Sequence, residues 1–168
     1  MAADVAARRR PPEDWLVVYG SLMRGLPASD PHAGAEPAAH KDRLDQLGVG
    51  AELRRVGPCR VPGVLFDLGP YPALRPARSE ADSVCGELHA VLDPRTLAVL
   101  VAFEGFDPQE PVGSDYLRER IELLEPRGMR AWIYVYNREP DASRRITPGD
   151  WRAHLAKRLA SAHDPDSR

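Results

Sequence analysis

The stretch that decides the fold class is residues 116–136, YLRERIELLEPRGMRAWIYVY. Residues 116–124 and 129–136 are rich in β-branched and aromatic side chains and alternate with polar ones, which is typical of strands. The intervening EPRG at 125–128 contains the proline and glycine that favour a turn. The pattern predicts an antiparallel hairpin.

Further strands are predicted on the N-terminal side of this hairpin. Short apolar or alternating runs occupy residues 16–19, 51–56, 61–68 and 84–92. The sequence GPC separates the second run from the third. The segment LGPYPAL that follows the third run is expected to take an irregular course because of its glycine and prolines.

Two helices are predicted among these strands. The first covers residues 93–104, with Asp93 as N-cap, Pro94 at the first helical position and Gly105 as the left-handed residue after the end. The second begins at the TPGD sequence of residues 147–150, which resembles a capping box, and places Trp151, Leu155 and Leu159 on one face.

This order of elements lacks the regular strand–helix alternation of a doubly wound parallel sheet. We therefore expect an α+β protein with a small mixed, mainly antiparallel sheet, curled into a β-barrel with flanking helices. The length of 168 residues predicts one domain, which we place at residues 15–160. Residues 1–14 and 161–168 are expected to be a flexible and a fraying tail, and residues 25–40 a long loop followed by a helical turn at 41–47.

Composition argues against several classes of partner. The 23 Lys and Arg nearly balance the 25 Asp and Glu, so charge gives no reason to expect binding to nucleic acid or to an anionic membrane. Cys59 and Cys85 form no CxxC pair, and the histidines lack metal-site spacing, so we expect no disulfide framework and no metal. The apolar run at 97–103 is too short to span a bilayer, and residues 1–14 contain no signal-peptide core. A cytoplasmic location is expected, and the oligomeric state is not predicted.

Glu104 interrupts the apolar face of the first helix. Leu97, Leu100 and Val101 lie at positions i, i+3 and i+4 of one face, and Glu104 takes the i+7 position. In one interpretation the carboxyl is buried, its pKa is raised, and it transfers protons near neutral pH. In the other it is solvated, or it pairs with an arginine such as Arg118 and has a structural role.

A series of motifs resembles a known family. VVYGSLM, GVLFDLGPYPAL, VCGELHAVLDP, FEG, DYLRERIEL, AWIYVY and ITPGDW occur in the order seen in γ-glutamylcyclotransferase-like, or AIG2-like, proteins. The resemblance extends from about Leu16 to Trp151. It implies a small β-barrel with flanking helices and a pocket between the YGSL turn and the glutamate of the EG pair, here Glu104. Val101 departs from the family pattern, since aspartate is usual at that position.

The resemblance also implies a reaction. The α-amine of a small γ-glutamyl amine or dipeptide would attack its own γ-carbonyl, giving 5-oxoproline and a free amine, without metal, nucleotide or other cofactor. Glu104 would be the general acid/base. The backbone N–H groups of Gly20, Ser21 and Leu22 would bind a substrate oxygen.

Four further side chains are assigned to the substrate site. Tyr116 would offer its hydroxyl, and Arg118 would bind a carboxylate or simply support Glu104. Tyr71 is a candidate pocket wall or core aromatic, and Tyr19 adjoins the turn, with core packing as its alternative role. A protein of the same fold that binds an amine or amino-acid conjugate without turnover is the competing function. A serine nucleophile at Ser21 is disfavoured because the GxSxG pattern is absent.

Overall fold

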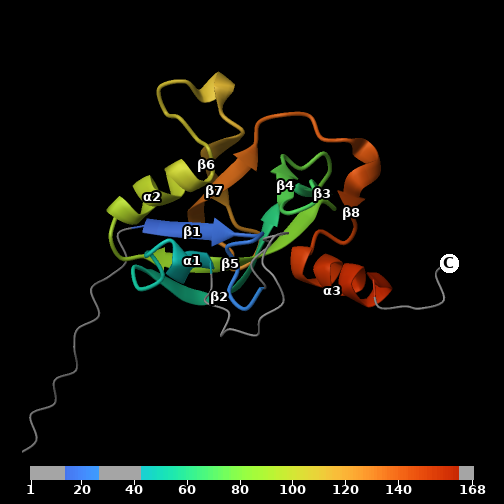
Figure 1. Ribbon diagram of the computed structural model, residues 1–168, viewed down its shortest axis with the longest axis horizontal. Helices are drawn as coiled ribbons and strands as arrows, with labels where there is room; N and C mark the ends of the chain where they lie inside the picture. The colour runs from blue at the N-terminus through green and yellow to red at the C-terminus, as the bar shows by residue number, and fades with distance from the viewer. Residues whose placement is uncertain (1–13, 27–42, 163–168) are drawn as a thin grey trace, which may run out of the picture.

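The predicted hairpin is present in the computed structural model, which describes residues 14–26 and 43–162 (Figure 1). Strands β6 (Tyr116–Glu122) and β7 (Arg130–Tyr136) pair antiparallel over their whole length, with Arg118 opposite Tyr134. The predicted tails at 1–14 and 161–168 and the loop at 25–40 lie almost wholly outside the described residues.

Three more strands extend the hairpin into a five-stranded sheet of order β2-β5-β1-β7-β6. Strand β1 (Asp14–Val18) pairs antiparallel with β5 (Ser83–Val91), which in turn pairs antiparallel with β2 (Leu53–Pro62). The pairing of β1 with β7 is parallel. The predicted mixed, mainly antiparallel arrangement is therefore confirmed.

A smaller sheet packs beside the first. It has the order β4-β3-β8 and consists of β3 (Val64–Asp67), β4 (Pro72–Arg75) and β8 (Arg145–Ile146). Residues 68–71, around Tyr71, follow the irregular course that was expected, whereas the last three residues of LGPYPAL belong to β4. The residues of β4 pair with those of β3 in an ordinary antiparallel ladder.

The strand pairings do not establish a closed barrel. Strands β2 and β6 are the edges of the larger sheet, and within the described residues they share no continuous ladder. An isolated antiparallel bridge links the end of the hairpin to β2: the Arg60 N–H donates to the Glu125 carbonyl oxygen and the Leu124 N–H to that of Arg60, each at 2.8 Å. The barrel part of the prediction is unconfirmed.

The boundary between the second and third predicted strands is wrong: the run at 51–56 ends too early, and the run at 61–68 contains the last two residues of β2 and all of β3. Strand β2 runs through GPC as a single ten-residue strand, with an irregularity between Arg55 and Gly57. Pro58 lacks the N–H that an interior strand would need for its second neighbour. It is tolerated because β2 is an edge strand.

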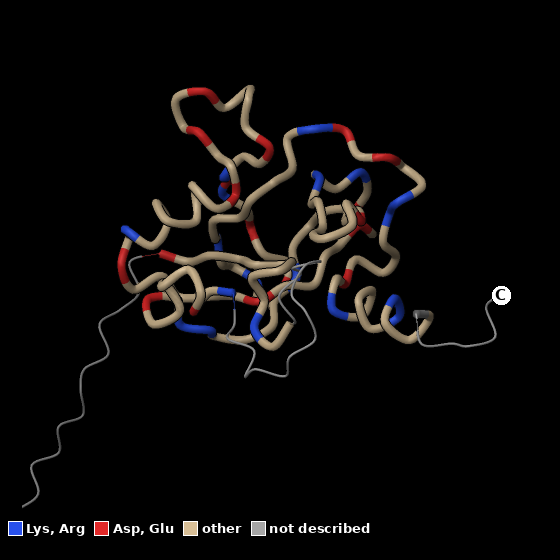
Figure 2. The backbone as a smooth tube through the Cα atoms, in the orientation of Figure 1, with Lys and Arg blue, Asp and Glu red and all other residues tan. Residues whose placement is uncertain are grey.

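The helices cover the ends and sides of the sheets (Figure 1). They are α1 (Arg43–Gln46), α2 (Arg95–Phe103) and α3 (Trp151–Ala162), and the short 3₁₀ helices Pro111–Gly113 and Ala142–Arg144 lie in loops. No helix in the described ranges is long and apolar enough to cross a membrane. Figure 2 shows basic and acidic positions interspersed along most of the chain, whereas the loop between α2 and β6 carries acidic positions only.

The ends of the helices follow local rules, with one correction. The Asp93 carboxylate accepts the Arg95 N–H at 2.9 Å, and Gly105 has a φ of +64°, the left-handed conformation that glycine adopts at low cost. At α3 the capping side chain is Asp150, which accepts the Ala153 N–H at 3.0 Å. The expected cap at Thr147 is wrong because the helix begins only at Trp151.

The main core cluster lies between the larger sheet, the helices and one face of the smaller sheet. Leu16, Leu88 and Ile133, on three adjacent strands, are fully buried or nearly so. From α2, Leu97 and Leu100 enter the same cluster, as the helical periodicity predicts. Packing of this face against the sheet directs the next position of the stripe, Glu104, to the end of β1.

Candidate active site

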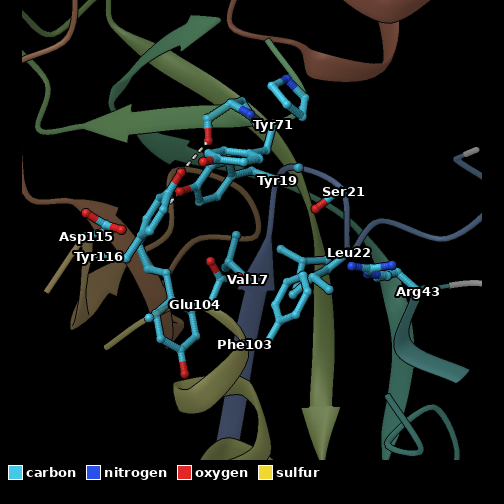
Figure 3. A pocket seen from close by; sticks show the side chains of 16 residues that line it. Val17, Tyr19, Ser21, Leu22, Arg43, Tyr71, Phe103, Glu104, Asp115 and Tyr116 are labelled. Atoms are coloured by element: carbon cyan, nitrogen blue, oxygen red, sulfur yellow. Dashed lines mark hydrogen bonds between the residues drawn. The ribbon is translucent and has the colours of Figure 1, made fainter. Parts of the chain in front are cut away.

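A cavity of about 350 Å³ opens where β1 ends (Figure 3). Its wall combines the end of β1 and the following turn, the end of α2, the proline turn before β4, and single residues of α1 and the hairpin. The lining residues are 17–22, Arg43, 70–72, 103–105, Asp115, Tyr116 and Tyr134. Of the predicted site residues, the structure thus brings together Glu104, Tyr19, Gly20, Ser21, Leu22, Tyr71 and Tyr116.

Glu104 is the acidic group at the centre of this wall. Its backbone N–H donates to the Leu100 carbonyl oxygen at 2.8 Å, so the last turn of α2 positions it. The side chain is only partly exposed, and in the described part of the chain its carboxyl forms neither a hydrogen bond nor an ion pair. Desolvation raises the pKa of Glu104 to about 7. A carboxyl with this pKa can both accept and donate a proton at neutral pH.

The turn after β1 lines the cavity, and three of its backbone N–H groups have no partner in the described residues. The Gly20 carbonyl oxygen accepts the Met23 N–H at 2.9 Å and closes the turn. The N–H groups of Gly20, Ser21 and Leu22 donate to no atom of the described residues. Consecutive free N–H groups facing a cavity form a site for an anion or a polarised carbonyl oxygen.

Gly20 is required in this turn because of how the turn packs, and not because of a left-handed conformation. Its φ is negative, so the left-handed conformations reserved for glycine are not used. A Cβ atom at Gly20 would lie 2.8 and 2.9 Å from Cγ and Cδ of Pro72. The glycine therefore permits the turn to approach residues 70–72, the proline segment, closely.

Tyrosines form much of the remaining wall, and two of their hydroxyls are engaged. The Tyr19 hydroxyl donates to the Tyr134 carbonyl oxygen at 2.6 Å, and the Tyr116 hydroxyl donates to the Pro72 carbonyl oxygen at 3.0 Å. Burial raises the pKa of both hydroxyls, and the neighbouring Glu104 adds to this. Each hydroxyl has one proton to donate, so Tyr116 can offer a ligand only its lone pairs.

Arg118 does not line the cavity. Its guanidinium lies over the Trp132 ring, with Cζ 4.9 Å from the ring centroid, and forms no ion pair with Glu104. Neither expected role, binding a substrate carboxylate or supporting Glu104, agrees with this position. Arg118 instead occupies the middle of β6, where the cation and the aromatic ring of β7 stabilise each other.

Several lining residues were not predicted. Arg43, Phe103, Asp115 and Tyr134 belong to this group. Strand alternation places Tyr134 and Tyr136 on one face, but nothing local distinguishes a pocket from a core. Burial raises the pKa of Tyr134 to about 12, so its hydroxyl stays protonated near neutral pH.

Comparison with known proteins identifies the family. The family model described as gamma-glutamyl cyclotransferase, AIG2-like, matches residues 16–153. The chain belongs to this family. The predicted resemblance is confirmed, and in this γ-glutamylcyclotransferase-like chain the match includes every element that lines the cavity.

Sequence relatives carry the same family name. A Vibrio cholerae protein named "Putative gamma-glutamylcyclotransferase" is 40% identical over 136 residues, covering 81% of this chain and 93% of its own length. The Escherichia coli gamma-glutamylcyclotransferase family protein YtfP is 37% identical over 87 residues, covering 52% of this chain and 66% of its own.

Solved structures share the fold. An uncharacterised protein from Pyrococcus horikoshii, PH0828, aligns with a TM-score of 0.59 at 16% identity, over 89% of this chain and 99% of its own. An AIG2-like protein from mouse aligns with a TM-score of 0.55 at 18% identity, over 82% of this chain and 87% of its own. At these identities the likeness concerns the α+β fold of the γ-glutamylcyclotransferase-like chain and not its chemistry.

Proposed function

We propose that this protein is a γ-glutamylcyclotransferase, which converts a γ-glutamyl amine or dipeptide into 5-oxoproline and a free amine. One observation carries the proposal: Glu104, whose carboxyl has a pKa of about 7 and no partner in the described residues, shares a cavity with the backbone N–H groups of residues 20–22, which also have none there. Family membership supports the same class of reaction.

The reaction needs a group that moves a proton between two nitrogens. Glu104 in its ionised form takes a proton from the α-ammonium, and the resulting amine attacks the γ-carbonyl carbon. A carbon–nitrogen bond forms to close the five-membered ring, and the bond to the departing nitrogen breaks as Glu104 returns the proton. Overall the attacking nitrogen loses two protons and the departing amine gains two; Glu104 transfers one, and the other is released to water from the ring nitrogen and taken up from water by the departing amine. General acid–base catalysis of this kind contributes about 10²–10⁴ in rate.

The reaction also needs stabilisation of the negative charge that develops on the γ-carbonyl oxygen. The N–H groups of Gly20, Ser21 and Leu22 donate to this oxygen. The turn that carries them lines the cavity and is closed by the hydrogen bond from the Met23 N–H to the Gly20 carbonyl oxygen, so these donors are held in place before substrate arrives. The tyrosine wall excludes water from the folded substrate and keeps the amine near the carbonyl carbon.

The experiment that tests the proposal is release of 5-oxoproline from a panel of γ-glutamyl amines and γ-glutamyl dipeptides. The wild-type protein is expected to release it from at least one member, and Glu104→Gln to lower kcat by about 10²–10⁴. Glu119→Gln, the same change at an exposed position of β6 outside the cavity, is the matched control and should keep wild-type activity.

The competing function predicts a different result. A binding protein of this fold shows saturable binding of a panel member by calorimetry and no product. Absence of product from every member would overturn the cyclotransferase proposal for that panel. Equal turnover by Glu104→Gln and the wild type would remove Glu104 from the mechanism.

A further inference from the structure

The cavity is electrostatically asymmetric. Among the lining residues that the structure describes, Arg43 is the one lysine or arginine. Figure 3 shows Arg43 on the side of Leu22 and Phe103, and Asp115 and Tyr116 on the opposite side. Of the acidic residues in the loop between α2 and β6, Glu104 and Asp115 line the cavity, and Asp115 also forms an ion pair with Arg138 at 2.8 Å.

Arg43 is held in place without an acidic partner. Its Cζ lies 5.2 Å from the centroid of the ring of Phe103, the residue that precedes Glu104 in the sequence. Its Nη1 donates to the Gln46 amide oxygen at 3.2 Å. Within the described residues it forms no ion pair. A guanidinium stacked on an aromatic ring keeps its charge and most of its donors available for another group.

We propose that Arg43 is a specificity-determining residue that binds a carboxylate of the substrate at this end of the cavity. The inference rests on the proposed function. A guanidinium matches a carboxylate by two parallel hydrogen bonds, and Arg43 is the one lysine or arginine among the described lining residues. The protein therefore prefers substrates that place a carboxylate beside Arg43 over neutral analogues of the same shape.

Two carboxylates of a γ-glutamyl dipeptide can satisfy this geometry. One belongs to the departing amino acid and the other is the α-carboxylate of the γ-glutamyl group. The pair γ-glutamyl-alanine and γ-glutamyl-alaninamide differs in the first, and the pair 5-oxoproline and 5-oxoprolinamide differs in the second. If Arg43 determines the preference within either pair, it is the anion-binding residue. The pair in which the preference depends on Arg43 shows which carboxylate it contacts.

The test compares wild type, Arg43→Gln and Arg43→Lys with each pair. We expect Arg43→Gln to lower the preference for the carboxylate member of one pair by about 10-fold to 100-fold, mainly through KM or Kd, because charged hydrogen bonds are lost. Arg43→Lys should retain part of the preference, and the neutral member should be unaffected. Arg127→Gln, the same charge change in the exposed hairpin turn, is the control.

Calorimetry separates failure of this inference from failure of the proposed function. The Glu104→Gln protein, with and without Arg43→Gln, is titrated with all four compounds. A carboxylate preference that depends on Arg43 supports the inference even if no 5-oxoproline is ever released. The inference is overturned if Arg43→Gln leaves the preference for the carboxylate over the neutral member unchanged in both pairs. It is also overturned if none of the four compounds binds.

Discussion

A methyl group on Gly20 would lie 2.8 Å from Cγ of Pro72, closer than carbon atoms approach without displacement. The turn that carries the free N–H groups is therefore packed directly against the proline segment. The carbonyl oxygen of the same Pro72 accepts a hydrogen bond from the Tyr116 hydroxyl. Direct contacts therefore link the turn, residues 70–72 and the hairpin.

Gly20→Ala should disturb both stability and the site. Overpacking of this kind costs about 1–3 kcal/mol of unfolding free energy, and the displaced turn no longer presents its N–H groups correctly. Urea unfolding and 5-oxoproline release measure the two effects. Gly57→Ala is the control, because a Cβ there meets nothing within 4 Å. Equal effects of the two substitutions would show that contact with Pro72 is unimportant.

The rate should depend on pH through Glu104. Only the ionised carboxylate can take the proton from the attacking ammonium, and desolvation raises the pKa of Glu104 to about 7. We expect kcat/KM to rise as pH increases through about 7 and to reach a plateau above it on this limb. A profile of kcat/KM between pH 5 and 9 tests this, and a limb centred near the ordinary value of about 4.5 would contradict it.

Glu104 should also lower stability at alkaline pH. Its pKa is higher in the folded than in the unfolded protein, so the folded state binds more protons between about pH 4.5 and pH 7. Unfolding free energy therefore falls as pH rises through this window. At pH 8, Glu104→Gln should be more stable than wild type by on the order of 1 kcal/mol. Urea unfolding at pH 5 and pH 8 measures the difference, which should nearly vanish at pH 5.

Glu87 holds the residue after the turn. Its Oε1 accepts from Nε of Arg55 and from Nη2 of Arg152, each at 3.1 Å, and its Oε2 accepts the Arg24 backbone N–H at 3.1 Å. Burial opposes ionisation, but hydrogen bonds from His89 and Arg24 and the charge of Arg55 outweigh it and lower the pKa of Glu87 to about 2.

Loss of this carboxylate should destabilise the protein in a pH-dependent way. The stabilisation is present above the unfolded pKa of about 4.5 and is lost as pH falls through about 2. Glu87→Gln should lower unfolding free energy at pH 7 by about 2–3 kcal/mol, because charged hydrogen bonds are removed. The deficit relative to wild type, measured by urea unfolding, should shrink at pH 3. A deficit independent of pH would assign the effect to packing.

Elements whose signals are local could be predicted from the sequence. The β6–β7 hairpin follows from strand alternation around a turn, and the core face of α2 follows from Leu97 and Leu100 at helical spacing. Strand β2 was divided wrongly at Pro58, because only a neighbouring strand decides whether a missing N–H matters. The cap of α3 was misplaced because Thr147 and Asp150 are both suitable residues, and packing selected the start of the helix.

The same distinction between local and long-range signals applies to the residues of the site. Glu104 could be predicted because an acidic residue in an apolar stripe is visible within one helix. The position of Arg118 outside the cavity could not be predicted, because strand alternation indicates a face but not what covers it, and Trp132 covers the face at Arg118. Arg43 was missed because its contact with Phe103 joins two helices that are distant in the chain.

The amino-acid sequence by itself determined the hairpin, the amphipathic α2 and the presence of a carboxyl where an apolar side chain was due, since each depends on periodicity within a few residues. Only the tertiary structure decided that Gly20 is needed for contact with Pro72, that the hydroxyls of Tyr19 and Tyr116 are already engaged, and that Arg43 is the one cation among the described lining residues. These features depend on which distant segments come together, and that is set by packing of the whole core.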